Sequence, residues 1–384
     1  MTVSTEDCPQ NYTKPPDVIL RRVKAVFHAF ILIGLFIILI SSPLMYGAVE
    51  NWQVNILVIV SIFVFVSWSV LGVFFSEDEI AKKRRSKLLL LVRIIPVFFI
   101  FLILLQIAPF SENILGVLSP AKAALNKEVG IDNTSTVSMA PYTTKLWIFR
   151  VIAYALVFYV ITSAFINRRL IVSMVALIVA FGYLLSLYGL LQYLSNNSLP
   201  AFINQTDADR ATGTFINPNH FAGFLELCAP LALSIVFIGK RRWGHGEADL
   251  WRRINDFILD KLHDRTVILP VAAFIIIALG IIFSLSRMGI LAFIISVFVF
   301  LMTLWRAEGK FVRTAVIFAI LAVVFIVCLW FGLDPVFERY LFIKEDAVGR
   351  YTGWKLAIDS FKDNSILGTG LGTFTYVSRL YQTH

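Results

Sequence analysis

Long apolar stretches dominate the pattern of hydrophobic and polar positions along the chain. A run of about 18 to 25 mostly apolar residues is long enough to cross the hydrocarbon core of a bilayer as a helix. Nine stretches have this character: 25–46, 54–75, 88–108, 146–165, 170–194, 220–238, 266–283, 288–305 and 314–332. The pattern therefore predicts an all-α, polytopic integral membrane protein with about nine transmembrane helices and a large outer loop.

The composition of the chain agrees with this reading. Hydrophobic residues make up 58% of the 384 residues and charged residues only 15%, whereas soluble domains are about half apolar and a quarter charged. This balance excludes a water-soluble enzyme. The first apolar run is too long for a cleavable signal peptide, and no small-residue cleavage site follows it. We expect it to remain as a membrane anchor.

The distribution of Lys and Arg predicts the orientation in the membrane. One set of alternate connecting segments holds 21 basic residues in 75, and the opposite set holds 11 in 125. Basic residues are retained on the cytoplasmic side, so we expect a cytoplasmic tail over 1–24, a transmembrane body over 25–332 and an outer loop over 333–384. The basic clusters lie at membrane ends and lack interleaved aromatic residues, so the net charge of +9 does not indicate nucleic-acid binding.

Residues 333–384 form the last predicted outer segment. They end without a closing helix or polar tail, so we expect the chain to be truncated inside the large outer loop. Trp354, Ala357, Ile358 and Phe361 recur at helical spacing. They predict an interfacial helix of about three turns within this loop.

Three polar segments fall on the predicted outer side. They are Arg210 with Gly213-Thr-Phe-Ile-Asn217-Pro218-Asn219-His220, then Ser284-Leu-Ser-Arg287, then Arg350 to His384 with Ile366-Leu-Gly368-Thr-Gly370-Leu-Gly372-Thr-Phe374. In this order the segments resemble the O-antigen ligase and O-antigen polymerase (Wzy_C-like) superfamily. The resemblance covers roughly positions 210–384, while the first 200 residues agree only in span count and topology.

The resemblance implies a GT-C-like membrane enzyme working at the periplasmic face. Its expected donor is a glycan on undecaprenyl diphosphate, and its acceptor is a hydroxyl of lipid A-core or of a growing glycan. The superfamily implies inversion at the anomeric carbon and no metal or other cofactor. Ligase and polymerase use the same donor, so the sequence leaves the two open. A transporter of lipid-linked sugars and a structural subunit of a polysaccharide assembly are further alternatives.

The expected catalytic residues follow from the charge of the leaving group. Fixed cations stabilise a diphosphate as the sugar–oxygen bond breaks, and Arg210 and Arg287 fit this role. The start of a helix after Asn219 adds a partial positive charge. The acceptor hydroxyl needs a base that is neutral near pH 7. The resemblance implies a loop histidine, and His384 is the candidate.

Asn217, Asn219, His220 and Arg350 are the expected substrate-binding residues. Each has a plainer alternative: the two asparagines as turn and helix-cap residues, His220 as an interfacial residue beside the cap, and Arg350 as an ion-pair partner of acidic neighbours.

Two further patterns are discounted. The Asp-x-Asp pair at 207–209 could hold a metal ion, but such pairs are common in polar loops. The glycines of 368–372 could form a phosphate-binding loop, but they follow no predicted strand. The glycines instead favour a turn with close backbone packing.

Overall fold

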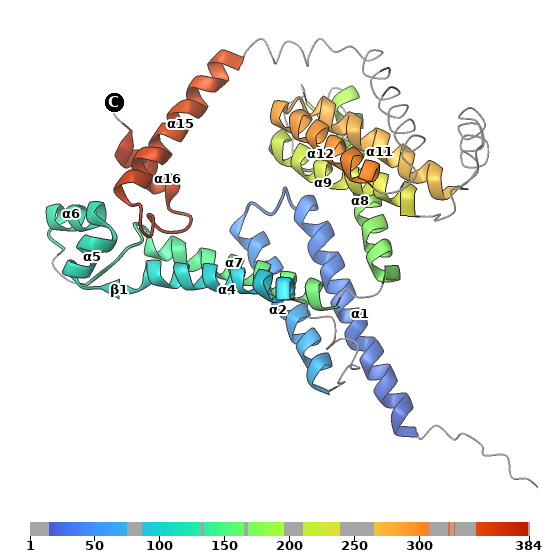
Figure 1. The fold of residues 1–384 in the computed structure, drawn as a ribbon, viewed down its shortest axis with the longest axis horizontal. Coiled ribbons are helices and arrows are strands. Elements are labelled where there is room, and N and C mark those ends of the chain that lie inside the picture. The colour runs from blue at the N-terminus through green and yellow to red at the C-terminus, as the bar shows by residue number, and fades with distance from the viewer. Residues whose placement is uncertain are drawn as a thin grey trace, which may run out of the picture. The chain divides into compact units, whose positions relative to one another are not determined.

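A computed structural model describes residues 15–74, 87–131, 134–164, 168–195, 210–238, 265–306 and 343–382, together with 322 and 326. The described chain is helical apart from a two-residue antiparallel ladder of β1 (Pro109–Phe110) and β2 (Ser135–Thr136) (Figure 1). The long helices are α1 (Pro15–Leu44), α2 (Asn51–Phe74), α4 (Lys87–Ile107), α7 (Pro141–Ala164), α8 (Arg168–Leu194), α9 (Pro218–Ile238), α11 (Arg265–Phe283), α12 (Arg287–Arg306) and α15 (Ile343–Asp363). The short elements are α5 (Glu112–Leu118), α6 (Pro120–Val129), α16 (Phe374–Val377) and the 3-10 helix η1 (Ser378–Tyr381).

Five of the described helices are long and apolar enough to cross a membrane. They are the spans Arg22–Leu44, Asn51–Val73, Pro141–Ser163, Leu170–Leu194 and Pro218–Val236. Three shorter apolar helices, Val92–Ile107, Ile268–Phe283 and Arg287–Thr303, coincide with three further predicted spans. The ninth predicted span, 314–332, lies almost entirely outside the described residues. The structure therefore supports an all-α membrane protein.

The chain divides into two compact units. Unit 1 comprises 1–38, 55–164 and 366–373, and unit 2 comprises 39–54, 165–365 and 374–384. Within unit 1, α4 packs against α7. Arg93 on α4 contributes to this contact, because its Nη2 donates to Ser163 Oγ at 2.8 Å and its guanidinium lies 4.7 Å from the ring centroid of Tyr159. A cation within an apolar helix is stabilised by polar and aromatic partners on the neighbouring helix.

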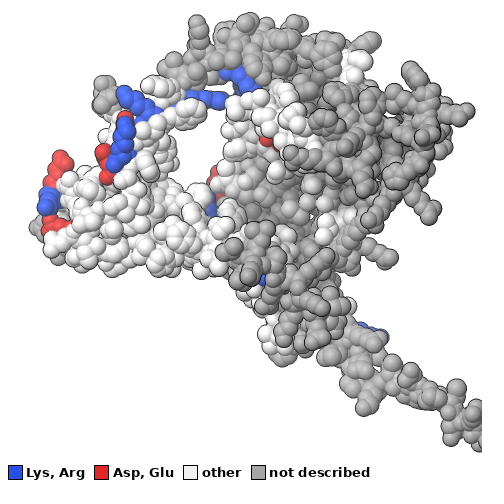
Figure 2. Space-filling view, viewed as in Figure 1, with Lys and Arg blue, Asp and Glu red and all other residues white. Residues whose placement is uncertain are grey.

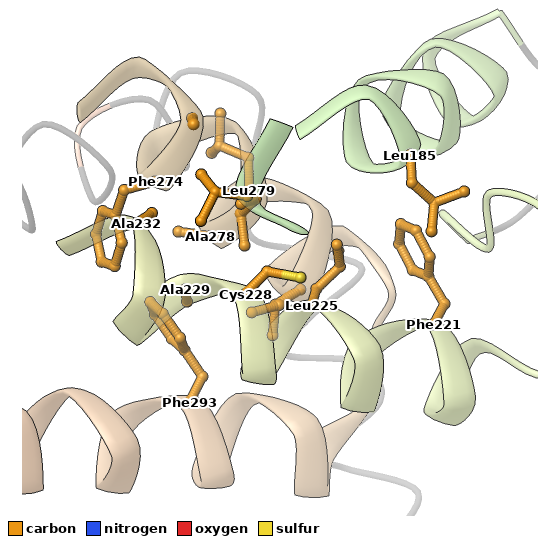
Figure 3. Close-up of a cluster of buried hydrophobic side chains, with 14 of the residues drawn as sticks. Leu185, Phe221, Leu225, Cys228, Ala229, Ala232, Phe274, Ala278, Leu279 and Phe293 are labelled. Atoms are coloured by element: carbon orange, nitrogen blue, oxygen red, sulfur yellow. The ribbon is translucent and has the colours of Figure 1, made fainter. Parts of the chain in front are cut away.

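The core of unit 2 forms around α9. This helix packs against α8, α11 and α12, and 44% of its apolar window is buried, compared with 11–22% in the other four candidate spans. Figure 3 shows Leu225, Cys228, Ala229 and Ala232 of α9 among side chains of α8, α11 and α12. Most faces of the remaining spans expose large apolar side chains, as expected for surfaces that lie against lipid.

Small residues allow the helices of unit 2 to approach closely. A Cβ added at Gly182 of α8 would lie 2.7 Å from Cys228 Sγ of α9, and one added at Gly280 of α11 would collide with Ser186 of α8. Ser186 Oγ donates to the carbonyl of Ile276 at 2.7 Å. Close backbone approach with hydrogen bonds between helices is the usual means of helix association in a membrane, where lipid supplies no hydrophobic driving force.

Candidate active site

The loop before α9 is built around the cap of that helix. Asn217 precedes Pro218, which suits the first helical position because proline has no N–H to satisfy. The Oδ1 of Asn217 accepts from the backbone N–H of Asn219 at 2.8 Å, and its carbonyl accepts from the N–H groups of His220 and Phe221. Asn217 is therefore the N-cap residue of α9, as one of the two sequence interpretations held. Asn217, Asn219 and His220 are all exposed.

The turn between α11 and α12 is held by two serines. Ser284 Oγ donates to the carbonyl of Ile281 at 2.6 Å and accepts from the N–H of Ser286 at 3.2 Å. Ser286 Oγ accepts from the N–H of Gly289 at 3.2 Å, so Ser286 caps α12. Arg287 is the first residue of α12 and is half-buried. The cap therefore fixes the backbone position from which the Arg287 side chain extends.

Two hydrogen bonds join this turn to the loop before α9. Ser286 Oγ donates to Oδ1 of Asn219 at 2.7 Å. The N–H of Ala211 donates to the carbonyl of Phe283 at 2.9 Å. Arg210 is next to Ala211 and Arg287 is next to Ser286, so the two predicted catalytic arginines belong to backbone segments that are bonded together. The starts of α9 and α12 meet at the same place, and their partial positive charges favour an anion there.

Backbone strain concentrates in the two turns that touch this loop. Among the described residues, the non-glycine residues with positive φ are Tyr46, Ala48 and Leu285, with φ of 55°, 55° and 52°. Leu285 lies in the turn held by Ser284 and Ser286. Tyr46 and Ala48 flank Gly47, whose added Cβ would lie 3.2 Å from the ring of Phe215. Such outliers cost about 1–3 kcal/mol each and cluster at functional sites.

Glycines and a threonine position the backbone of the loop. Gly213 has φ of +57°, and an added Cβ would lie 2.8 Å from the Phe221 ring. Gly189 of α8 faces it, and an added Cβ there would lie 2.9 Å from the nitrogen of Gly213. Thr214 Oγ1 donates to the carbonyl of Pro43, near the end of α1, at 2.7 Å. The loop therefore rests directly on α8, α9 and the end of α1.

Among the described residues, Arg350 is not part of this cluster. Arg350 is exposed on α15. His384 lies outside the described residues, which end at position 382. Of the predicted site residues, Arg210, Asn217, Asn219, His220 and Arg287 lie on the loop before α9, at the start of α9 and at the start of α12. Within the described parts of the chain, no three His, Cys, Asp or Glu side chains are grouped so that they could hold a metal ion.

The glycine segment 366–373 is bound by the ends of α4 and α7 in unit 1. The Nε2 of Gln106 donates to the carbonyl of Leu367 at 2.7 Å, and its Oε1 accepts from the N–H of Leu371 at 3.0 Å. Thr144 Oγ1 donates to the carbonyl of Leu371 at 3.1 Å, and the N–H of Met139 donates to the carbonyl of Thr369. The glycines allow the backbone to pack closely against other parts of the protein, as the sequence analysis predicted. Their neighbours in the structure are protein side chains.

Three of the residues that build these sites were not predicted. Ser286 has a recognisable signal, because a serine directly before an apolar helix is typical of an N-cap. Gln106 is a lone amide near the end of an apolar run. This position indicates that the amide has a polar partner, but not which residue the partner is. Gly189 carries no local signal, since its importance comes from a loop that is distant in sequence.

We predict that the Ser286–Asn219 hydrogen bond couples the two arginine-bearing segments energetically. Ser286→Ala leaves Asn219 Oδ1 and the N–H of Gly289 without this partner, so we expect a loss of about 1–3 kcal/mol in the free energy of unfolding. In a double-mutant cycle with Asn219→Ala the coupling should be about 0.5–3 kcal/mol. Thermal unfolding of the purified protein measures both quantities.

Ser234→Ala is the matched control, because the Ser234 hydroxyl donates to the carbonyl of Leu231 within its own helix. We expect it to change stability by no more than about 0.5 kcal/mol. Additive effects of Ser286→Ala and Asn219→Ala would show that the two segments are held independently.

Tyr381 fixes η1 to the end of α15. Its hydroxyl donates to Asp363 Oδ2 at 2.9 Å. Burial, and after it the hydrogen bond and negative charge of Asp363, raise the pKa of Tyr381. Because the folded pKa is raised, this stabilisation is complete below the ordinary tyrosine pKa of about 10 and is lost as the pH rises through the raised value.

We predict that Tyr381→Phe lowers the free energy of local opening of residues 374–382 at neutral pH by about 0.5–1 kcal/mol. The loss is small because the hydrogen bond is exposed to solvent. Amide hydrogen exchange of this segment measures the loss. The difference between wild type and Tyr381→Phe should vanish at pH values above the raised pKa. A difference that stays constant over this range would contradict the assignment.

Comparison with known families adds an independent result. Residues 272–384 match the family model Wzy_C, described as O-antigen ligase. No match was found among curated proteins or among solved structures. The matched range contains most of α11, all of α12 and α15, and the glycine segment, which carry two of the three motifs on which the predicted resemblance rested. The predicted resemblance is thus confirmed over residues 272–384, which match the family model described as O-antigen ligase.

Proposed function

We propose that the protein transfers a glycan from undecaprenyl diphosphate to an acceptor hydroxyl, as an O-antigen ligase-type enzyme of cell-surface polysaccharide biosynthesis. The family implies glycosyltransfer of the O-antigen ligase or polymerase type in general. The observation that supports the specific proposal most strongly is the 2.7 Å hydrogen bond between Ser286 and Asn219. This bond joins the loop that carries Arg210 to the turn before Arg287, and in this proposal the two guanidinium groups serve one site.

The donor end of the proposed reaction is an anion. As the bond between the anomeric carbon and the diphosphate oxygen breaks, its electron pair leaves with the diphosphate. Arg210 and Arg287 stabilise this charge, and arginine is suited to it because its planar fork binds phosphate oxygens in pairs. The starts of α9 and α12 add to the positive potential. The proposed mechanism takes its positive charge from these groups and uses no metal or cofactor.

The acceptor end requires removal of a proton. We propose that His384 accepts the proton of the acceptor hydroxyl while the hydroxyl oxygen forms a bond to the anomeric carbon. Attack opposite to the leaving diphosphate inverts the configuration at this carbon. The exposed side chains of Asn219 and His220, with Arg350, contact the donor in this proposal, and Asn217 acts through the cap of α9.

The proposed topology follows from the distribution of basic residues. Residues 1–24 form a cytoplasmic tail, 25–332 the transmembrane body and 333–384 a periplasmic loop with part of the active site. In this arrangement the three motif segments face the periplasmic side of the bacterial inner membrane, where lipid-linked donors are the activated substrates. The other partners are lipid A-core or a growing glycan, and membrane lipids.

Deletion of the gene distinguishes ligase from polymerase. A ligase deletion should accumulate long lipid-linked polymer that is not attached to its acceptor, and a polymerase deletion should accumulate single repeat units. Gel separation of the surface and lipid-linked glycans measures both. Unchanged glycans in every fraction would contradict the proposed function in either form.

A further inference from the structure

Helix α15 has two faces of different character. One face is packed: Ser360 and Asn364 are 6% and 1% exposed, and the helix contacts η1. The other face carries Tyr351, Trp354, Ile358 and Phe361, which follow each other at intervals of three and four residues and are exposed by 69%, 70%, 54% and 65%. Residues at these spacings form one stripe along a helix. We call these four residues the aromatic stripe.

The charges of α15 are distributed around the aromatic stripe by sign. At 3.6 residues per turn, Lys355 and Lys362 border one side of the stripe and Arg350 borders the other. Asp359 and Asp363 lie toward the packed face, where Asp363 accepts the hydrogen bond of Tyr381. Lys362 lies 3.5 Å from Asp359 in an exposed pair, which has little strength against solvent. The exposed side of the helix is thus apolar in the middle and positive at its edges.

Exposure of the aromatic stripe to water is unfavourable. Three large aromatic side chains and an isoleucine in one row make a continuous apolar surface of the kind that marks an interaction site. Tyrosine and tryptophan bordered by basic residues are typical of helices that lie at a membrane interface. The chain itself carries helices that are long and apolar enough to cross a membrane, and such helices would keep α15 near a bilayer surface. In Figure 2 most visible charged side chains of the described residues lie over α5–α6 and α15, in contrast to the white surfaces of the apolar helices.

We propose that α15 lies along the bilayer surface with the aromatic stripe inserted below the headgroups and its flanking cations on anionic phospholipid headgroups. The occupant of this face is therefore a lipid surface, not a protein partner. Inserted helices of this kind place their apolar face about 5–10 Å into the boundary of headgroups and acyl chains. The proposal concerns the attachment of α15 and does not depend on the transferase activity.

The consequence concerns the segment that follows α15. The packed face of α15 holds η1 through Tyr381, and η1 precedes His384. A helix fixed at the membrane surface would keep this segment at the height of the headgroups. A diphosphate at the end of a lipid tail lies at the same height, so insertion of α15 limits the search between the loop and a lipid-borne substrate to two dimensions.

Fluorescence in lipid vesicles tests the proposal on the whole protein. In a cysteine-free background, Ile358→Cys places an environment-sensitive dye on the aromatic stripe and Thr352→Cys places the same dye on an exposed position away from it. In vesicles with phosphatidylglycerol, the dye at position 358 should emit at shorter wavelength and be quenched by spin labels on lipid acyl chains. The dye at position 352 should emit as in water and be quenched by iodide in solution.

The two lysines test the role of charge. Each of Lys355→Gln and Lys362→Gln is expected to lower the ratio of inserted to free helix about fivefold in vesicles with phosphatidylglycerol. In vesicles of neutral phosphatidylcholine, the dye at position 358 should be quenched less by acyl-chain spin labels even when both lysines are present. Two results would overturn the proposal: a dye at position 358 that is as exposed to water as that at 352, or one that is shielded but not quenched by acyl-chain spin labels, which means that protein covers the stripe.

Discussion

Arg210→Ala and Arg287→Ala should each lower glycan transfer by about 10²–10³-fold, the usual effect of removing one group that stabilises transition-state charge. The effect should fall on the rate of the chemical step, because the negative charge of the diphosphate grows as the glycosidic bond breaks. Purified protein in vesicles, supplied with lipid-linked glycan and acceptor, provides the measurement. Arg→Lys at either position should be intermediate, since an ammonium group keeps the charge but not the planar fork.

Lys127→Ala is a suitable control for the two arginines. Lys127 on α6 is an exposed cation that lies 3.1 Å from Glu112, and an exposed pair of this kind contributes about 0–1 kcal/mol. This variant should transfer glycan at the wild-type rate. Wild-type transfer by both arginine variants, with normal membrane insertion, would contradict the assigned site.

The second large effect is expected in the glycine segment 366–373. Gly370 has φ of +102°, and an added Cβ would lie 2.9 Å from Thr144 Oγ1. Gly372 has φ of +77°, and an added Cβ would collide with the Trp147 ring. Alanine at either position combines backbone strain of about 1–3 kcal/mol with overpacking of about 1–3 kcal/mol. We expect the segment to detach from α4 and α7, with loss of hydrogen-exchange protection at Thr369 and Leu371 and loss of transfer.

Gly368→Ala separates strain from packing within the same segment. Gly368 has φ of +69°, but an added Cβ would meet nothing within 4 Å. It should therefore show only the strain of about 1–3 kcal/mol, with the segment still bound. Equal protection in all three alanine variants would show that the contacts of Thr144 and Trp147 do not hold the segment.

Local features of the fold could be predicted because short-range chemistry determines them. Apolar runs of sufficient length predicted eight of the described helices, and Asn217 before Pro218 predicted the cap of α9. The helical spacing of Trp354 and Phe361 predicted a helix that the structure extends to Ile343–Asp363. In each case the signal lies within a few turns of chain, where side-chain spacing and capping decide the structure.

Long-range features could not be predicted from these patterns. The hydrogen bonds of Gln106 to Leu367 and Leu371 join residues about 260 positions apart, and no local periodicity reports such a partner. The same holds for the division into two units, since apolar runs define spans but not which spans pack together. The pairing of Ser286 with Asn219 could be anticipated only as far as the topology predicted from Lys and Arg, which places both motifs on one face of the membrane.

Release of undecaprenyl diphosphate by the purified protein tests the central claim most directly. Vesicles containing the protein, a lipid-linked glycan and an acceptor should release one undecaprenyl diphosphate for each glycan joined to the acceptor, and Arg287→Ala should lower both signals together by about 10²–10³-fold. Movement of intact lipid-linked glycan between leaflets without release of undecaprenyl diphosphate would contradict the account and would indicate a transporter.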